Sequence, residues 1–150
     1  MDLLLAIASL FWFSISPMHK KPDIQGVSTI FGTKGDVHQG GTMACRPKER
    51  ALYKYACAHR TLPCGTLLLL KNPKTKQMSY CYVMDRGPYG GIDPEGNWFV
   101  KRTADEPGTW RGVLDVAPLP AKQLGHNGFQ RIKAWKAPKG LAKNFNALVW

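Results

Sequence analysis

The sequence is short of acidic residues and of metal-binding patterns. It contains 10 Asp and Glu against 21 Lys and Arg, and its formal net charge is +11. Such an excess attracts polyanionic partners, among them nucleic acid, anionic lipid and the bacterial envelope. The four histidines lack ligand-type spacing and no two cysteines form a CxxC pair, so we predict neither a metal site nor a bound cofactor.

Signatures of nucleic-acid binding are absent as well. The basic residues are scattered over the whole chain, without zinc-finger spacing, an RNP-like aromatic motif or a basic helix. We therefore expect no nucleic-acid partner in spite of the charge.

No apolar run is long enough to span a bilayer as a helix, which takes about 20 residues. The run from Leu3 to Ile15 is interrupted only by two serines and has the length of the apolar part of an export signal. Basic residues follow this run instead of preceding it, so a membrane tether through residues 1–16 stays open, as does a buried N-terminal helix. We assign residues 1–21 to an export signal or short anchor, residues 22–136 to one folded domain and residues 137–150 to a basic tail.

Cysteine is scarce but even in number. The four cysteines are Cys45, Cys57, Cys64 and Cys81. An even number in one short stretch predicts two disulfides formed in an oxidising compartment. Three connectivities are compatible with the sequence, and small buried free thiols are the alternative. Together with the N-terminal run, the cysteines predict an exported protein of the periplasm or cell envelope.

Helical periodicity is weak, and the chain from Gly26 onward has an all-β pattern. No apolar stripe at helical spacing is longer than about three turns, and Gly and Pro interrupt the apolar and β-branched runs. We predict strands at residues 27–31, 65–70, 78–84, 113–116 and 130–135, and one short helix at 120–125 that ends at a glycine. The leucines at 67–70 do not alternate with polar residues, which indicates a strand covered on both sides, as in a small closed barrel.

One connection is unusually long. Residues 90–110 are rich in Gly, Pro and acidic residues, and they contain or border Tyr89, Trp98, Phe99 and Trp110. We predict a long loop here, because no strand or helix pattern is visible. Loops of this length are commonly functional or disordered.

Four short segments are more specific. They read AHRTLPCGT at residues 58–66, VMDRGPY at 83–89, GVLDV at 112–116 and AKQLG at 121–125. In this order they resemble the sequence blocks of the RlpA-like double-psi β-barrel family, and residues 27–32 are similar to its opening strand. The resemblance covers residues 26–135 and implies an all-β, six-stranded double-psi barrel with one or two short helices.

The family includes lytic transglycosylases that cleave the glycan strands of peptidoglycan. The resemblance places Asp85 at the family's catalytic aspartate and His59 at its active-site histidine. A further functional glutamate of the family has no direct equivalent: Glu49 lies one place closer to His59 than an alignment without gaps requires, and Lys48 occupies the expected position. The catalytic set implied by the resemblance is therefore Asp85, His59 and, as the nearest carboxylate, Glu49.

Cleavage of a glycosidic bond needs the same residue types. A carboxylic acid must protonate the leaving oxygen, and a lytic enzyme uses the sugar's own 6-hydroxyl in place of water, so one carboxyl group can act first as acid and then as base. We assign this role to Asp85 and substrate positioning to His59. The residues predicted to bind substrate are Arg60, Thr61, Arg86, Tyr89, Trp98 and Trp110. Asp115 is interpreted as a structural or supporting group, and the two tryptophans have the alternative role of filling a barrel end.

Three functions stay open at this point. The leading prediction is an exported, monomeric lytic transglycosylase whose partner is the peptidoglycan glycan strand. The second is a wall-binding or wall-loosening module in the manner of expansins, which relate to this family in fold. The third is a phage lysis or virion component built on the same barrel.

Overall fold

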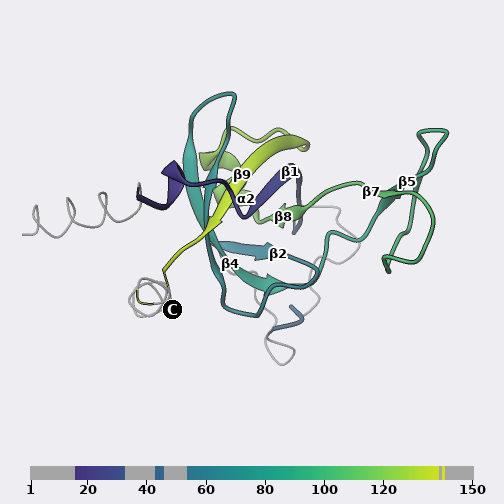
Figure 1. Cartoon of the computed structure of the whole chain (residues 1–150), viewed down its shortest axis with the longest axis horizontal. Helices are drawn as coiled ribbons and strands as arrows, with labels where there is room; N and C mark the ends of the chain where they lie inside the picture. The colour runs from purple at the N-terminus through teal and green to yellow at the C-terminus, as the bar shows by residue number, and fades with distance from the viewer. Residues whose placement is uncertain (1–15, 33–42, 46–53, 139, 141–150) are drawn as a thin grey trace, which may run out of the picture.

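The computed structural model describes residues 16–32, 43–45, 54–138 and 140. In chain order the elements are η1 (Ser16–His19), β1 (Ile24–Ile30), β2 (Ala56–Ala58), β3 (Leu67–Lys71), β4 (Met78–Asp85), β5 (Gly91–Ile92), β6 (Trp98–Phe99), β7 (Thr109–Trp110), β8 (Leu114–Val116), α2 (Pro118–Gln123) and β9 (Gln130–Lys136) (Figure 1). Within these described ranges, no helix combines the length and the apolar character needed to cross a membrane.

Six of the strands form a closed barrel. Their order around it is β1-β8-β2-β4-β3-β9. Two neighbouring pairs, β1 with β8 and β2 with β4, run parallel, and the other pairs run antiparallel. The prediction of an all-β, six-stranded barrel with a short helix is therefore confirmed.

The predicted strands and helix are present with slightly shifted ends, but β2 was not predicted. Its sequence, Ala56-Cys57-Ala58, has no β-branched or aromatic residue that would indicate a strand. All three residues are buried, and β2 lies between β8 and β4. Tertiary pairing on both sides therefore decides the conformation of this segment.

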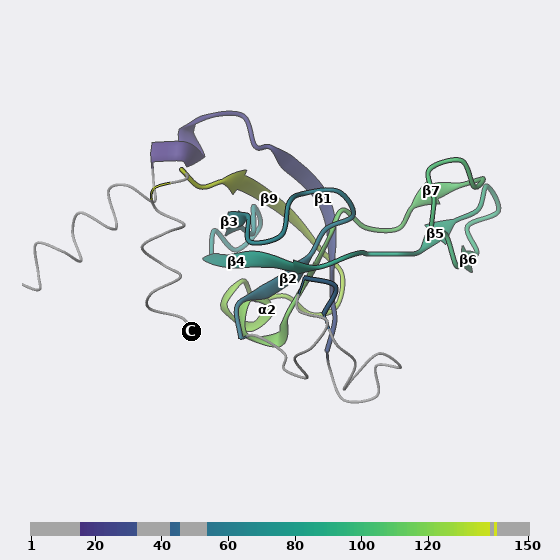
Figure 2. The ribbon, with the colours of Figure 1, turned by 90° about the horizontal axis from the view of Figure 1, so that it is seen from below.

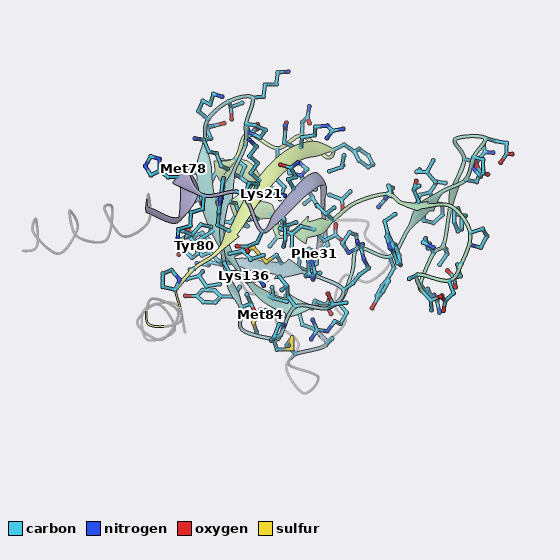
Figure 3. The ribbon with its side chains drawn as sticks, in the orientation of Figure 1. Lys21, Phe31, Met78, Tyr80, Met84 and Lys136 are labelled. Carbon is cyan, nitrogen blue, oxygen red and sulfur yellow. A yellow bond between two sulfur atoms is a disulfide. The ribbon has the colours of Figure 1, made fainter. Side chains whose placement is uncertain are left out.

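The barrel has an apolar interior to which every strand contributes. The buried members are Cys57, Leu68, Leu70, Cys81, Val83, Leu114, Val116, Ala121, Leu124, Ile132 and Ala134, and Ile24 and Ile30 of β1 pack against them. The alternate residues of β2, β3 and β4 form a second cluster on the outer face, as the period of a strand requires. This outer cluster includes Ala56, Leu67, Tyr82 and Met84, with Phe31 and Tyr80 packed against it (Figure 3). The predicted coverage of the leucine run on both sides is confirmed.

Two disulfides join the four cysteines, Cys45 to Cys64 and Cys57 to Cys81 (Figure 3). The second links β2 to β4 inside the core, since Cys57 and Cys81 are both fully buried. The first attaches the segment at residues 43–45 to the loop before β3. Two disulfides are consistent with folding in an oxidising environment. The alternative interpretation, in which the cysteines are buried free thiols, is wrong because all four are paired.

The start of the described chain is attached to the barrel before the predicted domain boundary. The indole Nε1 of Trp135 on β9 donates to the carbonyl oxygen of Lys20 at 2.8 Å. The backbone N–H of Lys136 donates to the Asp23 carboxylate, also at 2.8 Å. Lys20 lies inside the segment assigned to export, whereas residues 1–15 of that segment lie outside the described residues.

The region predicted as a long loop is a small three-stranded sheet with the order β6-β5-β7. It projects from one side of the barrel, as Figures 1 and 2 both show. We call residues 90–111 the lobe. Each of its strands is two residues long, which is too short to produce a recognisable alternation in the sequence.

A buried lysine stabilises the interior of the lobe. Lys101 is 2% exposed, and its Nζ donates to the carbonyl oxygens of Ala104, at 3.3 Å, and Glu106. The same Nζ lies 4.9 Å from the ring centroid of Trp110. These carbonyl acceptors and the aromatic ring compensate for the hydration that the ammonium group loses on burial.

His126 is a buried polar residue that joins the turn after α2 to β1. Its Nδ1 accepts a hydrogen bond from the backbone N–H of Gly128 at 3.0 Å, and its Nε2 lies 3.0 Å from the Ser28 hydroxyl oxygen. Because Nδ1 is an acceptor, the neutral ring carries its proton on Nε2 and donates it to Ser28. Burial lowers the pKa of the imidazole below its ordinary value of 6.5, against a smaller opposite contribution from a hydrogen bond with the Ser28 backbone.

We expect acid to destabilise the fold through His126. The unfolded imidazole takes up a proton near pH 6.5, whereas the folded one does so only at lower pH. The unfolded state therefore binds more protons in this window, and the free energy of unfolding decreases as the pH falls below 6.5. His126→Gln should reduce the difference between the unfolding free energies measured by urea denaturation at about pH 7.5 and about pH 5.5. His19→Gln, at an exposed site, is the control, and an unaltered pH dependence in H126Q would contradict the prediction.

Candidate functional site

The two main motif segments meet at one end of the barrel. Ala58, the last residue of β2, pairs with Asp85, the last residue of β4, in a parallel arrangement. The backbone N–H of His59 donates to the carbonyl oxygen of Asp85 at 3.1 Å. Parallel strands end at the same edge, so the pairing brings the predicted catalytic aspartate and histidine to adjacent positions.

A bulge sets which residue of β4 faces Ala58. The register runs from Cys57 opposite Val83 to Ala58 opposite Asp85, so Met84 is passed over. Bulges re-aim the side chains that follow them and are frequent next to active sites. Without the bulge, the apolar side chain of Met84 would occupy the place beside Ala58.

Ala58 also pairs with Asp115 on β8, which in turn pairs with Thr29 on β1. A row in the order Thr29, Asp115, Ala58, Asp85 therefore crosses four neighbouring strands. The Thr29 hydroxyl donates to Oδ1 of Asp115. Gly87 covers this row with φ +142°, and a Cβ on it would lie 3.7 Å from Oδ2 of Asp115 and 3.8 Å from the Ala58 Cβ.

The Asp85 carboxylate is oriented by backbone N–H groups. Its Oδ1 accepts hydrogen bonds from Ala44, at 2.9 Å, and from Arg86, at 2.8 Å. Ala44 is held there because the neighbouring Cys45 is bonded through its N–H to the carbonyl of Met84, at 3.0 Å, and through its sulfur to Cys64. Among the described residues, no donor is bonded to Oδ2 of Asp85.

The imidazole of His59 has a defined tautomer. Its Nδ1 accepts the backbone N–H groups of Thr61, at 3.1 Å, and Leu62, at 3.0 Å. An atom that accepts two hydrogen bonds carries no proton, so the neutral ring has its proton on Nε2. Burial, followed by the positive charges of Arg60, Arg86 and Lys136, lowers the pKa of His59 below 6.5. At neutral pH the ring is therefore an uncharged hydrogen-bond donor through Nε2.

Arg86 connects the two motif segments from the inside. Its Nη1 donates to the carbonyl oxygens of His59, at 3.1 Å, and Leu62, at 2.5 Å, and its Nη2 lies 3.4 Å from the Cys64 sulfur. These contacts fix the loop that holds the His59 ring. Its predicted contact with substrate stays a prediction.

Arg60 also fixes loops through its guanidinium group, in this case the two segments that lead into and out of the lobe. Its Nη1 donates to the carbonyl oxygens of Pro88 and Gly112, both at 2.8 Å, and its guanidinium carbon lies 4.1 Å from the ring centroid of Trp110. Burial lowers the pKa of Arg60 below its ordinary value, although the charges of Tyr89 and Asp115 act in the opposite direction. Arg60 thus anchors the lobe to the barrel end that carries the site.

The aromatic candidates differ in how accessible they are. Tyr89 is 46% exposed and Trp98 is 55% exposed, whereas Trp110 is half-buried beside Arg60 and Lys101. Tyr89 and Trp98 are therefore accessible from solvent, whereas the Trp110 ring contacts both Arg60 of the barrel and Lys101 of the lobe.

Glu49, the third residue of the predicted catalytic set, lies outside the described residues. In the part of the chain that the structure describes, no group of three His, Cys, Asp or Glu side chains is placed to hold a metal ion. No protein-family model matches the sequence, and no curated protein matches it either.

Sequence reasoning did not find Ala44, whose N–H holds the Asp85 carboxylate. Every residue except proline has a backbone N–H, so the residue type at position 44 does not indicate this contact. The adjacent Cys45 was the only indication that this segment would be attached near the site.

We expect His59 to be neutral with its proton on Nε2 at pH 7. Long-range ¹H–¹⁵N NMR should show Nδ1 with the shift of an unprotonated acceptor. The ring should titrate below pH 6.5, because burial and then the positive charges of Arg60, Arg86 and Lys136 disfavour its charged form. A proton on Nδ1, or titration above the ordinary value, would show that the described geometry is wrong.

We expect the disulfide between Cys45 and Cys64 to keep the Ala44 N–H hydrogen-bonded to the Asp85 carboxylate. The double substitution Cys45→Ser and Cys64→Ser should lower the free energy of unfolding by about 2–4 kcal/mol, since the unfolded chain loses a crosslink. The Ala44 amide should exchange with solvent faster by NMR, because its attachment to Asp85 depends on this crosslink.

The matched reference amide is Val83, which is bonded to the carbonyl of Thr66 in the barrel and should stay protected. Equal protection of Ala44 with and without the disulfide would show that other contacts hold the segment.

Proposed function

We propose that this protein cleaves peptidoglycan glycan strands as a lytic transglycosylase of the RlpA-like double-psi barrel family. The observation that carries the proposal is the pairing of Ala58 with Asp85 and the hydrogen bond from the His59 N–H to the Asp85 carbonyl. Two segments that carry the family resemblance, separate in the sequence, thereby meet at one strand end. Sites on strand ends combine a rigid scaffold with access to solvent.

Asp85 acts as the acid and then as the base. Its carboxyl group donates a proton to the glycosidic oxygen as the bond from that oxygen to the anomeric carbon breaks. The 6-hydroxyl oxygen of the same sugar bonds to the anomeric carbon, and the hydroxyl proton passes to the carboxylate. No water is consumed, and the product ends in a 1,6-anhydro sugar. The contacts of Oδ1 with Ala44 and Arg86 leave Oδ2 for this exchange.

His59 positions the substrate through its Nε2 proton. A neutral imidazole donates one hydrogen bond without adding a charge next to the acid. The depressed pKa of His59 keeps it in this form at neutral pH. Tyr89 and Trp98 supply exposed aromatic surface for the sugar rings.

The charge and the disulfides agree with action in the envelope. A net charge of +11 raises the local concentration of an anionic polymer through long-range attraction. Two disulfides are typical of exported proteins. We therefore propose an exported, monomeric enzyme that needs no cofactor.

A wall-binding module without catalysis is the second candidate. One observation favours it: Oδ1 of Asp85 already accepts two backbone N–H groups, including that of the next residue. A carboxylate that only caps a strand end would make the same contacts.

The test is incubation of the full chain with sacculi and with peptide-free glycan strands, followed by mass spectrometry of the soluble products. The wild type should release anhydro-muramyl fragments, and Asp85→Asn should lower the rate at least ~10²-fold, because an amide cannot exchange the proton. Asp105→Asn, an exposed carboxylate in the lobe, is the matched control and should be fully active. Binding to both substrates without release of any product would contradict the enzyme proposal and support the wall-binding module.

A further inference from the structure

One arginine lies between two exposed aromatic rings where the lobe meets the barrel. The guanidinium carbon of Arg111 is 5.9 Å from the ring centroid of Trp98 and 5.4 Å from that of Phe129. Trp98 is on β6 of the lobe, and Phe129 precedes β9 of the barrel. We call these three side chains the Arg111 surface.

Both rings are unusually accessible for large apolar groups. Trp98 is 55% exposed and Phe129 is 61% exposed. Rings that served only to pack the junction would be largely covered, because burial is what stabilises them. The exposed area next to a cation therefore points to a ligand.

The charge of Arg111 has no acidic partner in the described part of the chain. Its backbone N–H is bonded to Gly90, but its side-chain Nε is buried and lacks a hydrogen-bond acceptor. Arg60 and Arg86, in contrast, donate to backbone carbonyls. The Nε of Arg111 is closed to a ligand, but among the described residues its Nη1 and Nη2 are neither buried nor hydrogen-bonded. These outer nitrogens can therefore meet an acceptor that a ligand supplies.

Close contacts also hold the residues of this surface in place. The absence of a side chain at Gly90 lets Trp98 and Arg111 approach, since a Cβ there would lie 3.0 Å from the indole Nε1 and 3.5 Å from the Arg111 Nε. Lys101 and Arg60 hold the lobe on either side of Trp110. Side chains that are already in place lose little conformational entropy on binding.

We infer that the Arg111 surface is a binding subsite for a sugar that carries a carboxylate. The planar guanidinium suits bidentate contact with a carboxylate, and the two rings offer faces for the apolar side of a pyranose. This inference rests on the proposed function for its choice of glycan. In a peptide-free strand, every muramic acid presents the free carboxylate of its lactyl group, whereas a neutral N-acetylglucosamine polymer has none.

The experiment compares two ligands of equal length. One is a peptide-free fragment of alternating N-acetylglucosamine and N-acetylmuramic acid, and the other is an oligomer of N-acetylglucosamine alone. Binding is measured by calorimetry with the full chain carrying Asp85→Asn, so that the proposed cleavage does not alter the ligand. The fragment with carboxylates should bind about tenfold more tightly, as expected for a hydrogen-bonded charge pair, and added salt should reduce this preference.

The variants separate charge from stacking. Arg111→Gln should remove the preference for the carboxylate-bearing ligand, and Phe129→Ala should weaken binding of both ligands. Arg131→Gln, an exposed arginine of β9, is the matched control and should keep both affinities. Persistence of the preference in R111Q would overturn the inference.

This outcome is independent of the cleavage assay. If sacculi are cleaved and R111Q binds like its parent, the inference fails and the proposed enzyme stands. If no cleavage occurs but binding of the carboxylate-bearing ligand depends on Arg111, the inference stands and the proposed enzyme fails.

Discussion

The short strand β2 is the element on which the rest of the molecule depends. It lies between β8 and β4, so without it the barrel would stay open and two strand edges would lack partners. Ala58 pairs on one side with Asp85 and on the other with Asp115. Closure of the barrel and alignment of the two carboxylates therefore have the same cause. The disulfide from Cys57 to Cys81 holds this position covalently.

Polar groups around the site are arranged mainly by the backbone. Amides of Ala44 and Arg86 hold the Asp85 carboxylate, and amides of Thr61 and Leu62 hold the His59 ring. The nearby arginines donate to carbonyl oxygens of the loops. Backbone donors in fixed loops need little reorganisation, so the fold itself sets the positions of the Asp85 carboxylate and the His59 imidazole.

The lobe adds a second kind of surface to this barrel. Its interior holds the Phe99 ring, which packs against Gly91 and Gly108, and the buried Lys101, and Arg60 fixes it to the barrel. An aromatic side chain of the lobe is therefore on its outer surface, since Trp98 is largely exposed. A chain with a net charge of +11 thus uses part of its positive charge for internal support and presents another part, at Arg111, beside exposed rings.

The sequence by itself determined the longer strands, because runs such as Leu67–Lys71 and Met78–Asp85 have strong local patterns. Its motif segments also pointed to Asp85 and His59 as candidate site residues. The tertiary structure alone decided β2 and the strands of the lobe, which are too short for periodicity, and the cysteine pairing, which depends on distance. It also decided the surroundings of Ala44 and Arg111: the N–H of Ala44 meets the Asp85 carboxylate, and Arg111 has no acidic partner among the described residues, only because of the groups that the fold places around them.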